Sequence, residues 1–247
     1  MERHLGNAPI TEALVDIVVE PKTGLGYSDV EKAFREPDFG YYVKNPISEG
    51  TFAFGFGQDG QPIPPTSESG LVGLRLHSKD EKYVLQVRPN RFTLSRLPPY
   101  EDWATLVFET KRVWAIFSSR LKPRKATRIA ARYINNLRLP MHAGDSFQEF
   151  IQKMVNIPDG APQAVEGFLQ RFQLFDVESG VRVILTLTLE GLAPDGIAPV
   201  MLDVDAFKMV NLSPYEAEIW TELEKIKELK NRSFFGSLAE RALELYK

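Results

Sequence analysis

The chain has 247 residues, of which 43% are hydrophobic and 26% charged, and its formal net charge is −3. This length allows one large domain or two small ones, and the composition is that of an ordinary globular protein. The absence of cysteine excludes disulfide bonds and cysteine-ligated zinc or iron–sulfur sites. The sequence has no signal-peptide pattern and no apolar run long enough for a transmembrane helix, so we expect a cytoplasmic protein.

The net charge conceals an uneven distribution along the chain. Residues 1–70 hold 5 basic and 11 acidic side chains, residues 71–138 hold 15 and 5, and residues 139–247 hold 10 and 17. The basic middle predicts attraction for an anionic partner. The alternative is that these basic side chains pair with acidic ones from the two ends of the chain, because surface ion pairs form easily.

The first half of the chain predicts a strand, a short helix, several antiparallel strands and a long helix. Alternating apolar and polar residues indicate the strands, and apolar residues spaced i, i+3, i+4 indicate the long helix. Segment 58–70 holds three prolines and two glycines and is predicted to be a loop. The strands are expected at 9–20, 51–57, 71–77, 82–88 and 91–97, the short helix at 29–35 with Ser28 as its N-cap, and the long helix at 100–121.

The second half repeats this order. Segment 163–175 is ambiguous and fits a helix that runs into a strand, and Asn231 and Arg232 are expected to break the last helix. Pro-Tyr-Glu occurs at 99–101 and again at 214–216, where proline favours the first turn of each long helix. The repetition favours an internal duplication. Strands are expected at 126–139, 181–190 and 200–210, a short helix at 147–155, and further helices at 215–230 and 233–246.

These elements predict an α+β fold with two similar β-α-β4-α halves, residues 1–123 and 124–247. The halves are expected to form an antiparallel sheet with helices on one face. This element order resembles the fold of the TATA-box-binding protein, in which the other face of the sheet is open. The resemblance concerns architecture and implies little about function.

A sheet with one covered face directs apolar side chains toward the helices and polar side chains outward. The strands therefore predict a broad polar surface with a basic part, suited to a nucleic acid, a nucleotide or a protein partner. An ordinary solvated face is the alternative. The basic part holds Arg75, His77, Gln86, Arg88, Arg128, Arg132, Asn136 and Arg138, and the second half adds Thr186, Thr188, Asp203 and Asp205.

Motifs for catalysis or cofactor binding are mostly missing. The three histidines, His4, His77 and His142, lack the spacing of metal ligands. The sequence has no Gly-x-Ser-x-Gly elbow, no Gly-x-Gly-x-x-Gly loop and no Walker-type loop. We therefore expect no cofactor.

The best catalytic candidates are two alternate carboxylates, Asp203 and Asp205. On a strand they point to the same side and are weak candidates for holding Mg²⁺. Such a site usually needs a third acidic residue, and Asp16 and Glu190 are the candidates for it. The favoured alternative is a surface acidic pair that binds arginine.

Six short stretches stand out in the chain. They are Asn7-Ala8-Pro9-Ile10-x-Glu12-Ala13-Leu14, Leu85-Gln86-Val87-x-x-Asn90-Arg91-Phe92, Pro99-Tyr100-Glu101-x-Trp103, Arg132-Tyr133-Ile134-Asn135, Leu202-Asp203-Val204-Asp205 and Phe234-Phe235-x-Ser237-Leu238. In this order and spacing the chain resembles, over nearly its full length, a sporadically distributed prokaryotic family of uncharacterised proteins. Such a distribution implies mobile genes, as in toxin–antitoxin or phage-defence loci. The family has no assigned activity and no agreed catalytic residues, so no residue role is carried over.

The main functional hypothesis is a non-catalytic binding or regulatory protein. The alternatives are a nucleic-acid-binding protein that uses the basic sheet face and a metal-dependent enzyme that acts on nucleotides. A homodimer is also predicted, because aromatic residues such as Phe234 and the set Phe52, Phe54 and Phe56 need cover if they are exposed.

Overall fold

A computed structural model describes residues 5–36, 38–56, 62–141, 145–154, 157–191 and 196–247, with the backbone alone for 51–56, 62–68 and 190. The fold is α+β, with one antiparallel sheet of nine strands in the order β2-β3-β4-β5-β1-β6-β9-β8-β7. This confirms the predicted fold class. The first half contains β1 (Ile10–Glu20), α1 (Tyr27–Phe34), β2 (Tyr41–Phe56), β3 (Pro62–Ser78), β4 (Tyr83–Arg88), β5 (Arg91–Arg96) and α2 (Trp103–Leu121). The second contains β6 (Lys125–Pro140), the 3-10 turn η1 (Phe147–Glu149), β7 (Gly167–Phe175), β8 (Arg182–Glu190), β9 (Ile197–Leu212), α3 (Glu218–Ser237) and α4 (Glu240–Glu244).

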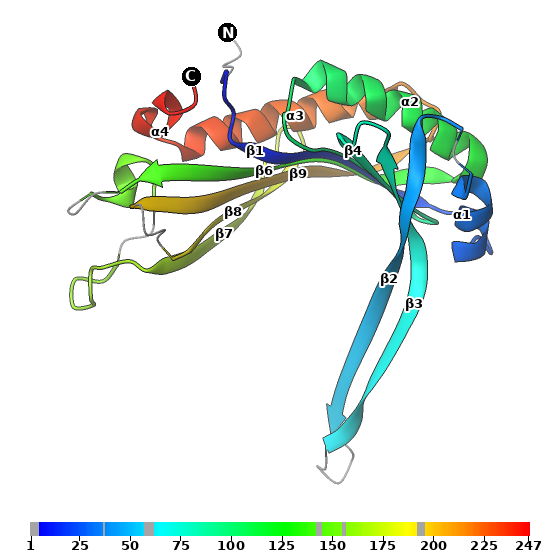
Figure 1. The fold of residues 1–247 in the computed structure, drawn as a ribbon, viewed down its shortest axis with the longest axis horizontal. Coiled ribbons are helices and arrows are strands. Elements are labelled where there is room, and N and C mark those ends of the chain that lie inside the picture. Colours follow the sequence, from blue (N-terminus) through cyan, green and yellow to red (C-terminus); the bar gives the residue numbers. More distant parts are fainter. Residues whose placement is uncertain (1–4, 37, 57–61, 142–144, 155–156, 192–195) are drawn as a thin grey trace.

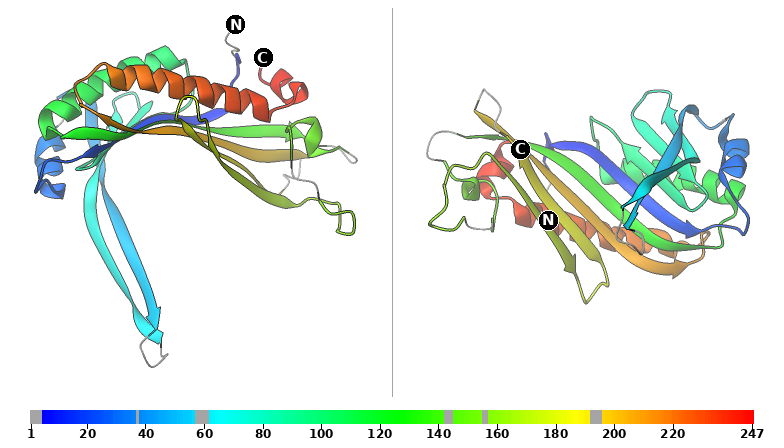
Figure 2. Two further views of the ribbon diagram at one scale, coloured as in Figure 1. Left: turned by 180° about the vertical axis from the view of Figure 1, so that it is seen from behind. Right: turned by 90° about the horizontal axis from the view of Figure 1, so that it is seen from below.

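The sheet has one covered and one uncovered face. The long helices α2 and α3 lie side by side on the covered face (Figure 1), and Figure 2 looks from below onto the other face. At the centre of the sheet β1 pairs with both β5 and β6, so the sheet is continuous across the boundary between the two halves. We call the two faces the helix side and the open face.

The core follows from the alternation of side chains along the central strands. Val15 and Ile17 of β1 are fully buried on the helix side, as are Ile129 and Ala131 of β6 opposite them. Successive side chains of a strand point to opposite faces, so the residues between these point to the open face. One hydrophobic core under α2 and α3 therefore spans both halves.

The β2–β3 hairpin is longer than predicted. Segment 58–70 was expected to be a loop, but β3 begins at Pro62 and pairs with β2 from there, while residues 57–61 lie outside the described part. The outer part of β3 pairs with β2 alone, because pairing with β4 is confined to Leu74–His77. Proline is tolerated where a strand lacks a neighbour on one side. The hairpin projects from the sheet on the side away from the helices (Figure 1).

The structure differs from the expected elements at several helix ends. Helix α1 is capped at Gly26 rather than at Ser28, and α2 begins at Trp103 with Asp102 as its N-cap, past the Pro-Tyr-Glu segment. Helix α3 continues through the expected break at Asn231 to Ser237. The predicted helix 147–155 is only the short turn η1 in the described residues. The start of α2 has a local cause, because the Asp102 side chain accepts a hydrogen bond from the backbone N–H of Thr105.

The second half has fewer strands than expected. After β6 and η1, three strands follow in the described residues, whereas the repeated pattern predicted four. The region that would supply the missing strand holds Pro158, Gly160 and Pro162, which disfavour a strand. Segment 163–175, which was ambiguous in the sequence, contains β7. The internal duplication stays a prediction.

Candidate functional site

All eight basic-face candidates lie on the open face. Arg75 is opposite Gln86, His77 is opposite Val84, and Asn136 is opposite Met201, so these side chains alternate with the buried ones. They form two separate groups, because β5 and β1 lie between β4 and β6. The first group is Arg75, His77, Gln86 and Arg88, and the second is Arg128, Arg132, Asn136 and Arg138.

Asp16 lies at the centre of the open face, in the gap between these groups. Its carboxylate is 2% exposed and accepts three hydrogen bonds. Arg91 Nε and Thr93 Oγ1 each donate to Oδ1 at 2.6 Å, and Arg128 Nη1 donates to Oδ2 at 2.8 Å. A buried carboxylate needs such partners, since burying an unpaired charge is very unfavourable.

The two strand carboxylates of β9 extend this network. Arg128 Nη2 lies 3.1 Å from Asp205 Oδ2, and the guanidinium of Arg132 donates two hydrogen bonds to Asp203, at 2.9 and 2.6 Å. Arg128 thus bridges Asp16 and Asp205. A cation at Asp203 and Asp205 would have to displace both arginines, and no group of three potential metal ligands occurs among the described residues. The arrangement favours the interpretation of the acidic pair as a partner of arginine.

The protonation of Asp205 gives the network a testable pH dependence. Burial raises the pKa of Asp205 above its ordinary value of 3.8, and the nearby Arg128 and Arg132 oppose this only in part. In the interval above pH 3.8 Asp205 therefore holds its proton more strongly in the folded state than in the unfolded state, and its contribution to stability falls as pH rises. The non-titrating variant Asp205→Asn should gain stability relative to wild type as the pH rises through this interval. Urea unfolding at pH steps measures this, and a constant difference between the two proteins would contradict it.

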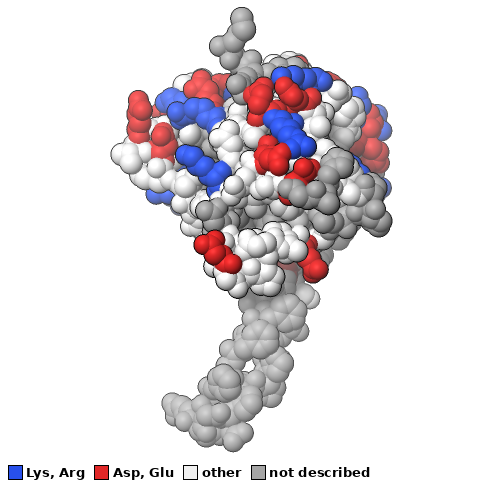
Figure 3. Space-filling model, turned by 90° about the vertical axis from the view of Figure 1, so that its left-hand side faces the viewer, with Lys and Arg blue, Asp and Glu red and all other residues white. Residues whose placement is uncertain are grey.

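Two of the remaining candidates also lie beside acidic side chains. Arg88 forms an ion pair with Glu49, and His77 Nδ1 lies 2.6 Å from Glu81 Oε2. Arg75 and Asn136 are exposed. The pairing of Arg88, Arg128 and Arg132 with acidic side chains supports the alternative that the basic middle of the chain balances charge within the protein. Figure 3 likewise shows acidic and basic side chains interspersed on the end of the molecule where α4 lies.

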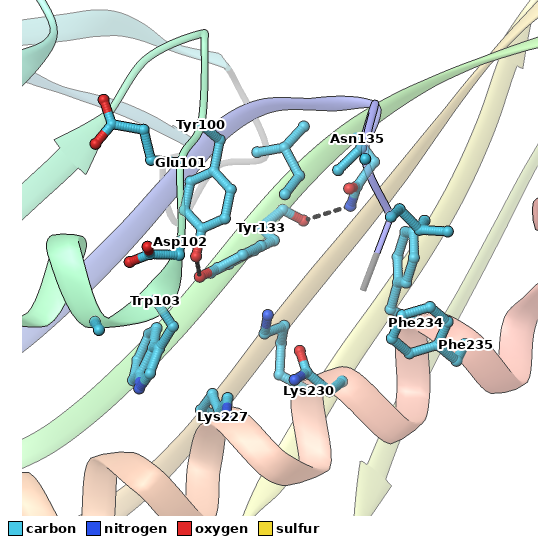
Figure 4. A pocket seen from close by; sticks show the side chains of 16 residues that line it. Tyr100, Glu101, Asp102, Trp103, Tyr133, Asn135, Lys227, Lys230, Phe234 and Phe235 are labelled. Atoms are coloured by element: carbon cyan, nitrogen blue, oxygen red, sulfur yellow. Dashed lines mark hydrogen bonds between the residues drawn. The ribbon is translucent and has the colours of Figure 1, made fainter. Parts of the chain in front are cut away.

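A pocket of about 510 Å³ lies on the helix side, at a place that the sequence did not indicate. We call it the helix-side pocket (Figure 4). Its walls come from residues within 5–10, from 100–104 at the start of α2, from Tyr133 and Asn135 of β6, and from five side chains of α3 between residues 227 and 235. The α3 side chains are Lys227, Lys230, Asn231, Phe234 and Phe235.

Aromatic and cationic groups meet inside this pocket. The ammonium nitrogen of Lys230 lies 3.2 Å from the centre of the Tyr133 ring, although the Lys230 side chain is only 5% exposed. The hydroxyl groups of Tyr133 and Tyr100 are 2.6 Å apart. Burial, followed by the proximity of Tyr100, raises the pKa of the Tyr133 hydroxyl well above its ordinary value. This hydroxyl therefore stays protonated at neutral pH and keeps its hydrogen-bonding proton.

A buried amide completes the floor of the pocket. Asn135 is 1% exposed, and its Nδ2 donates to the carbonyl oxygen of Leu202 at 2.9 Å and to that of Tyr133 at 3.3 Å. These bonds to β9 and β6 fix the orientation of the side chain. Both N–H bonds of the Asn135 amide are therefore engaged within the sheet.

The two carboxylates of the pocket have other partners. Asp102 Oδ1 accepts from the backbone N–H of Thr105 as the N-cap of α2, at 2.7 Å. Glu101 Oε1 accepts from Arg96 Nη2 at 2.8 Å, and Arg96 is 2% exposed with no partner for its Nε and Nη1 among the described residues. In Figure 4 the Glu101 carboxylate points away from the space between Lys230 and Asn135. That space is therefore bordered mainly by cationic, amide and aromatic groups.

Four of the six stretches singled out in the sequence supply side chains to the helix-side pocket. The first stretch supplies Ala8 and Ile10, and the Pro99–Trp103 stretch supplies Tyr100, Glu101 and Trp103. The Arg132–Asn135 stretch supplies Tyr133 and Asn135, and the last stretch supplies Phe234 and Phe235. The sequence did not reveal the site, because it assigns each stretch to a separate strand or helix and does not show which of these elements lie together. Phe234, considered above as an exposed dimer contact, is 9% exposed and faces this pocket, and the side chains of Phe52, Phe54 and Phe56 lie outside the described part.

Comparison with known proteins gives no family assignment. No family model matches the chain, and no curated protein matches it either. The family resemblance therefore stays a prediction. Within the described residues, the helices are all too short or too polar to span a membrane.

Proposed function

We propose that the protein is a non-catalytic binding protein that takes a small organic anion with an aromatic body in the helix-side pocket. The observation that carries this proposal is the meeting of Lys227, Lys230 and the amide of Asn231 within aromatic walls in a pocket of about 510 Å³. Pockets for small ligands measure roughly 300–1,000 Å³ and combine apolar walls with a few polar groups. Carboxylate, phosphate and sulfonate groups match ammonium and amide donors.

Binding, rather than catalysis, fits the lining. The described residues that line the pocket include no histidine, serine or threonine, and the chain has no cysteine, so a hydroxyl or thiol nucleophile paired with a histidine base is absent from this lining. Its carboxylates are engaged by Thr105 and Arg96. This supports the main functional hypothesis from the sequence and moves the candidate site from the open face to the helix side.

Two matched fluorescent dyes test the proposal. Anilinonaphthalene sulfonate carries an anionic group on an aromatic body, and N-phenyl-1-naphthylamine has the same body without the charge. We expect Lys230→Met to weaken binding of the anionic dye about tenfold, which corresponds to about 1.4 kcal/mol, and to leave the neutral dye unchanged. Fluorescence titration measures both affinities, and an unchanged affinity for the neutral dye shows that the apolar part of the pocket is intact.

Two further variants control for other sites. Lys225→Met removes an ammonium from α3 that pairs with Glu222 outside the pocket, and it should change neither dye. Ala104→Trp adds bulk at an exposed position of the lining and should weaken both dyes. Equal binding of the anionic dye to wild type and Lys230→Met would reject the proposed anion site.

A further inference from the structure

The sheet has two edges, β2 and β7, and the chain treats them differently. A strand at the edge of a sheet presents unpaired backbone N–H and C=O groups that can pair with another chain. Proteins usually protect such edges with lysine, proline or bulges. Edge β2 has all three, since it contains Lys44 and Pro46 and its pairing with β3 is interrupted by three register shifts.

Edge β7 has none of these features. It pairs with β8 without interruption from Gly167 to Phe175, and its only charged residue is Arg171. Four apolar side chains on it are exposed: Leu169 by 71%, Phe172 by 36%, Leu174 by 48% and Phe175 by 54%. They lie on both faces of the strand, because Phe172 and Leu174 are opposite the buried Leu185 and Val183 of β8, whereas Leu169 and Phe175 alternate with them. An edge of this kind is a template for a further strand.

We propose that β7 pairs in antiparallel fashion with β7 of a second copy of this chain, about a twofold axis at Phe172. Residues directly opposite each other in an antiparallel pair lie on the same face of the sheet. A symmetric pair therefore places one residue opposite its own copy. With Phe172 in that position, Leu169 is opposite Phe175 of the second copy and Arg171 is opposite Gln173, so the seven residues 169–175 are all paired.

Charge and strand length select this register over its neighbours. An axis at Arg171 would place two arginines opposite each other, which is destabilising. An axis at Gln173 would place Leu169 opposite residue 177, in the turn that follows β7, where Asp176 and Gly180 are hydrogen-bonded to each other. The axis at Phe172 instead brings the two Phe172 rings together on the helix side and covers Leu169 and Phe175 on the open face. Such aromatic and aliphatic cross-strand pairs stabilise a sheet.

The absence of cysteine makes this register directly testable. Opposite residues of an antiparallel pair have Cα atoms about 4.5–5.5 Å apart, which a disulfide can bridge. We expect Phe172→Cys to form a disulfide-linked dimer under mild oxidation. Leu169→Cys alone and Phe175→Cys alone should not crosslink, because in each dimer the two introduced cysteines lie roughly 20 Å apart along the strands. A mixture of the two variants should crosslink, because residue 169 of one copy is opposite residue 175 of the other.

Two controls complete the experiment. Met209→Cys lies on β9 away from the edge and is 57% exposed in the wild type, so it reports random collisions. Phe172→Lys places two charges opposite each other and should weaken the dimer at least tenfold in sedimentation velocity over a concentration series. Crosslinking of Phe172→Cys no faster than that of Met209→Cys, or a wild type that stays monomeric at all concentrations, would overturn the proposal. Phe172→Lys should leave the dye titrations of the helix-side pocket unchanged, so the two proposals fail separately.

Discussion

Replacing Asp16 with alanine is expected to lower the free energy of unfolding by about 1–3 kcal/mol, the usual loss when a buried hydrogen-bonding group is removed and its partners are left unpaired. Asp16 is 2% exposed and joins Arg91, Thr93 and Arg128 from two neighbouring strands. Without it, Arg128 keeps Asp205 as an acidic partner, but Arg91 and Thr93 lose the acceptor that they share. Urea unfolding of wild type and variant measures the change.

An aspartate on the surface provides the control for this prediction. Asp38 also accepts a short hydrogen bond from an arginine, Arg120, at 2.6 Å, but its side chain is 79% exposed. Exposed ion pairs contribute little, so Asp38→Ala should leave the midpoint of urea unfolding unchanged within error. Equal effects of the two variants would show that burial does not decide the strength of the network on the open face.

The sequence allowed most of the strands to be predicted, because apolar and polar residues alternate along a strand wherever only one face of the sheet is covered. Val15 and Ile17 alternate with Asp16, and Ile129 and Ala131 alternate with Arg128 and Arg132. The register then places those arginines on the open face as predicted. Propensity and periodicity are local properties, and these features depend on them alone.

The partners of these side chains were not predictable, because they depend on strand order. Arg128 meets Asp16 and Asp205 only because β6 lies between β1 and β9. Asp16 was considered as a third acid beside Asp205, and the two carboxylates do lie near each other, but an arginine joins them. The helix-side pocket depends on strand order in the same way, since its lysines and tyrosines come from segments that lie far apart in the sequence.

The β2–β3 hairpin shows a second limit of sequence reasoning. Three prolines and two glycines in 58–70 predicted a loop, but a two-stranded ribbon tolerates proline where its outer side is unpaired. One glycine of β3, Gly73, is required at the point where the hairpin leaves the sheet. A Cβ atom on Gly73 would lie 2.4 Å from the carbonyl oxygen of Val87, so only glycine fits at this crossing.

Replacing Phe92 with alanine should lower the free energy of unfolding by about 3–5 kcal/mol, the typical loss for a large aromatic side chain in a core. Phe92 is fully buried, and its ring centre lies 5.4 Å from that of Trp114 and 5.5 Å from that of Phe117. Trp114 Nε1 in turn donates to the carbonyl oxygen of Pro214 at 2.9 Å, ahead of α3. The cluster therefore connects the core of the first half to the second half.

This connection predicts the form of the unfolding curve as well as its midpoint. If the two halves unfold together, Phe92→Ala should give one transition at lower urea, with the same midpoint by tryptophan fluorescence and by circular dichroism. Phe108→Ala is the control, because Phe108 lies on α2 and is 72% exposed, so its loss should change the unfolding free energy by less than about 0.5 kcal/mol. Two separate transitions in Phe92→Ala would mean that the second half keeps its fold without the first. The continuous sheet through β1 and β6 argues for the single transition, since unfolding either half would expose the long paired edge of the other.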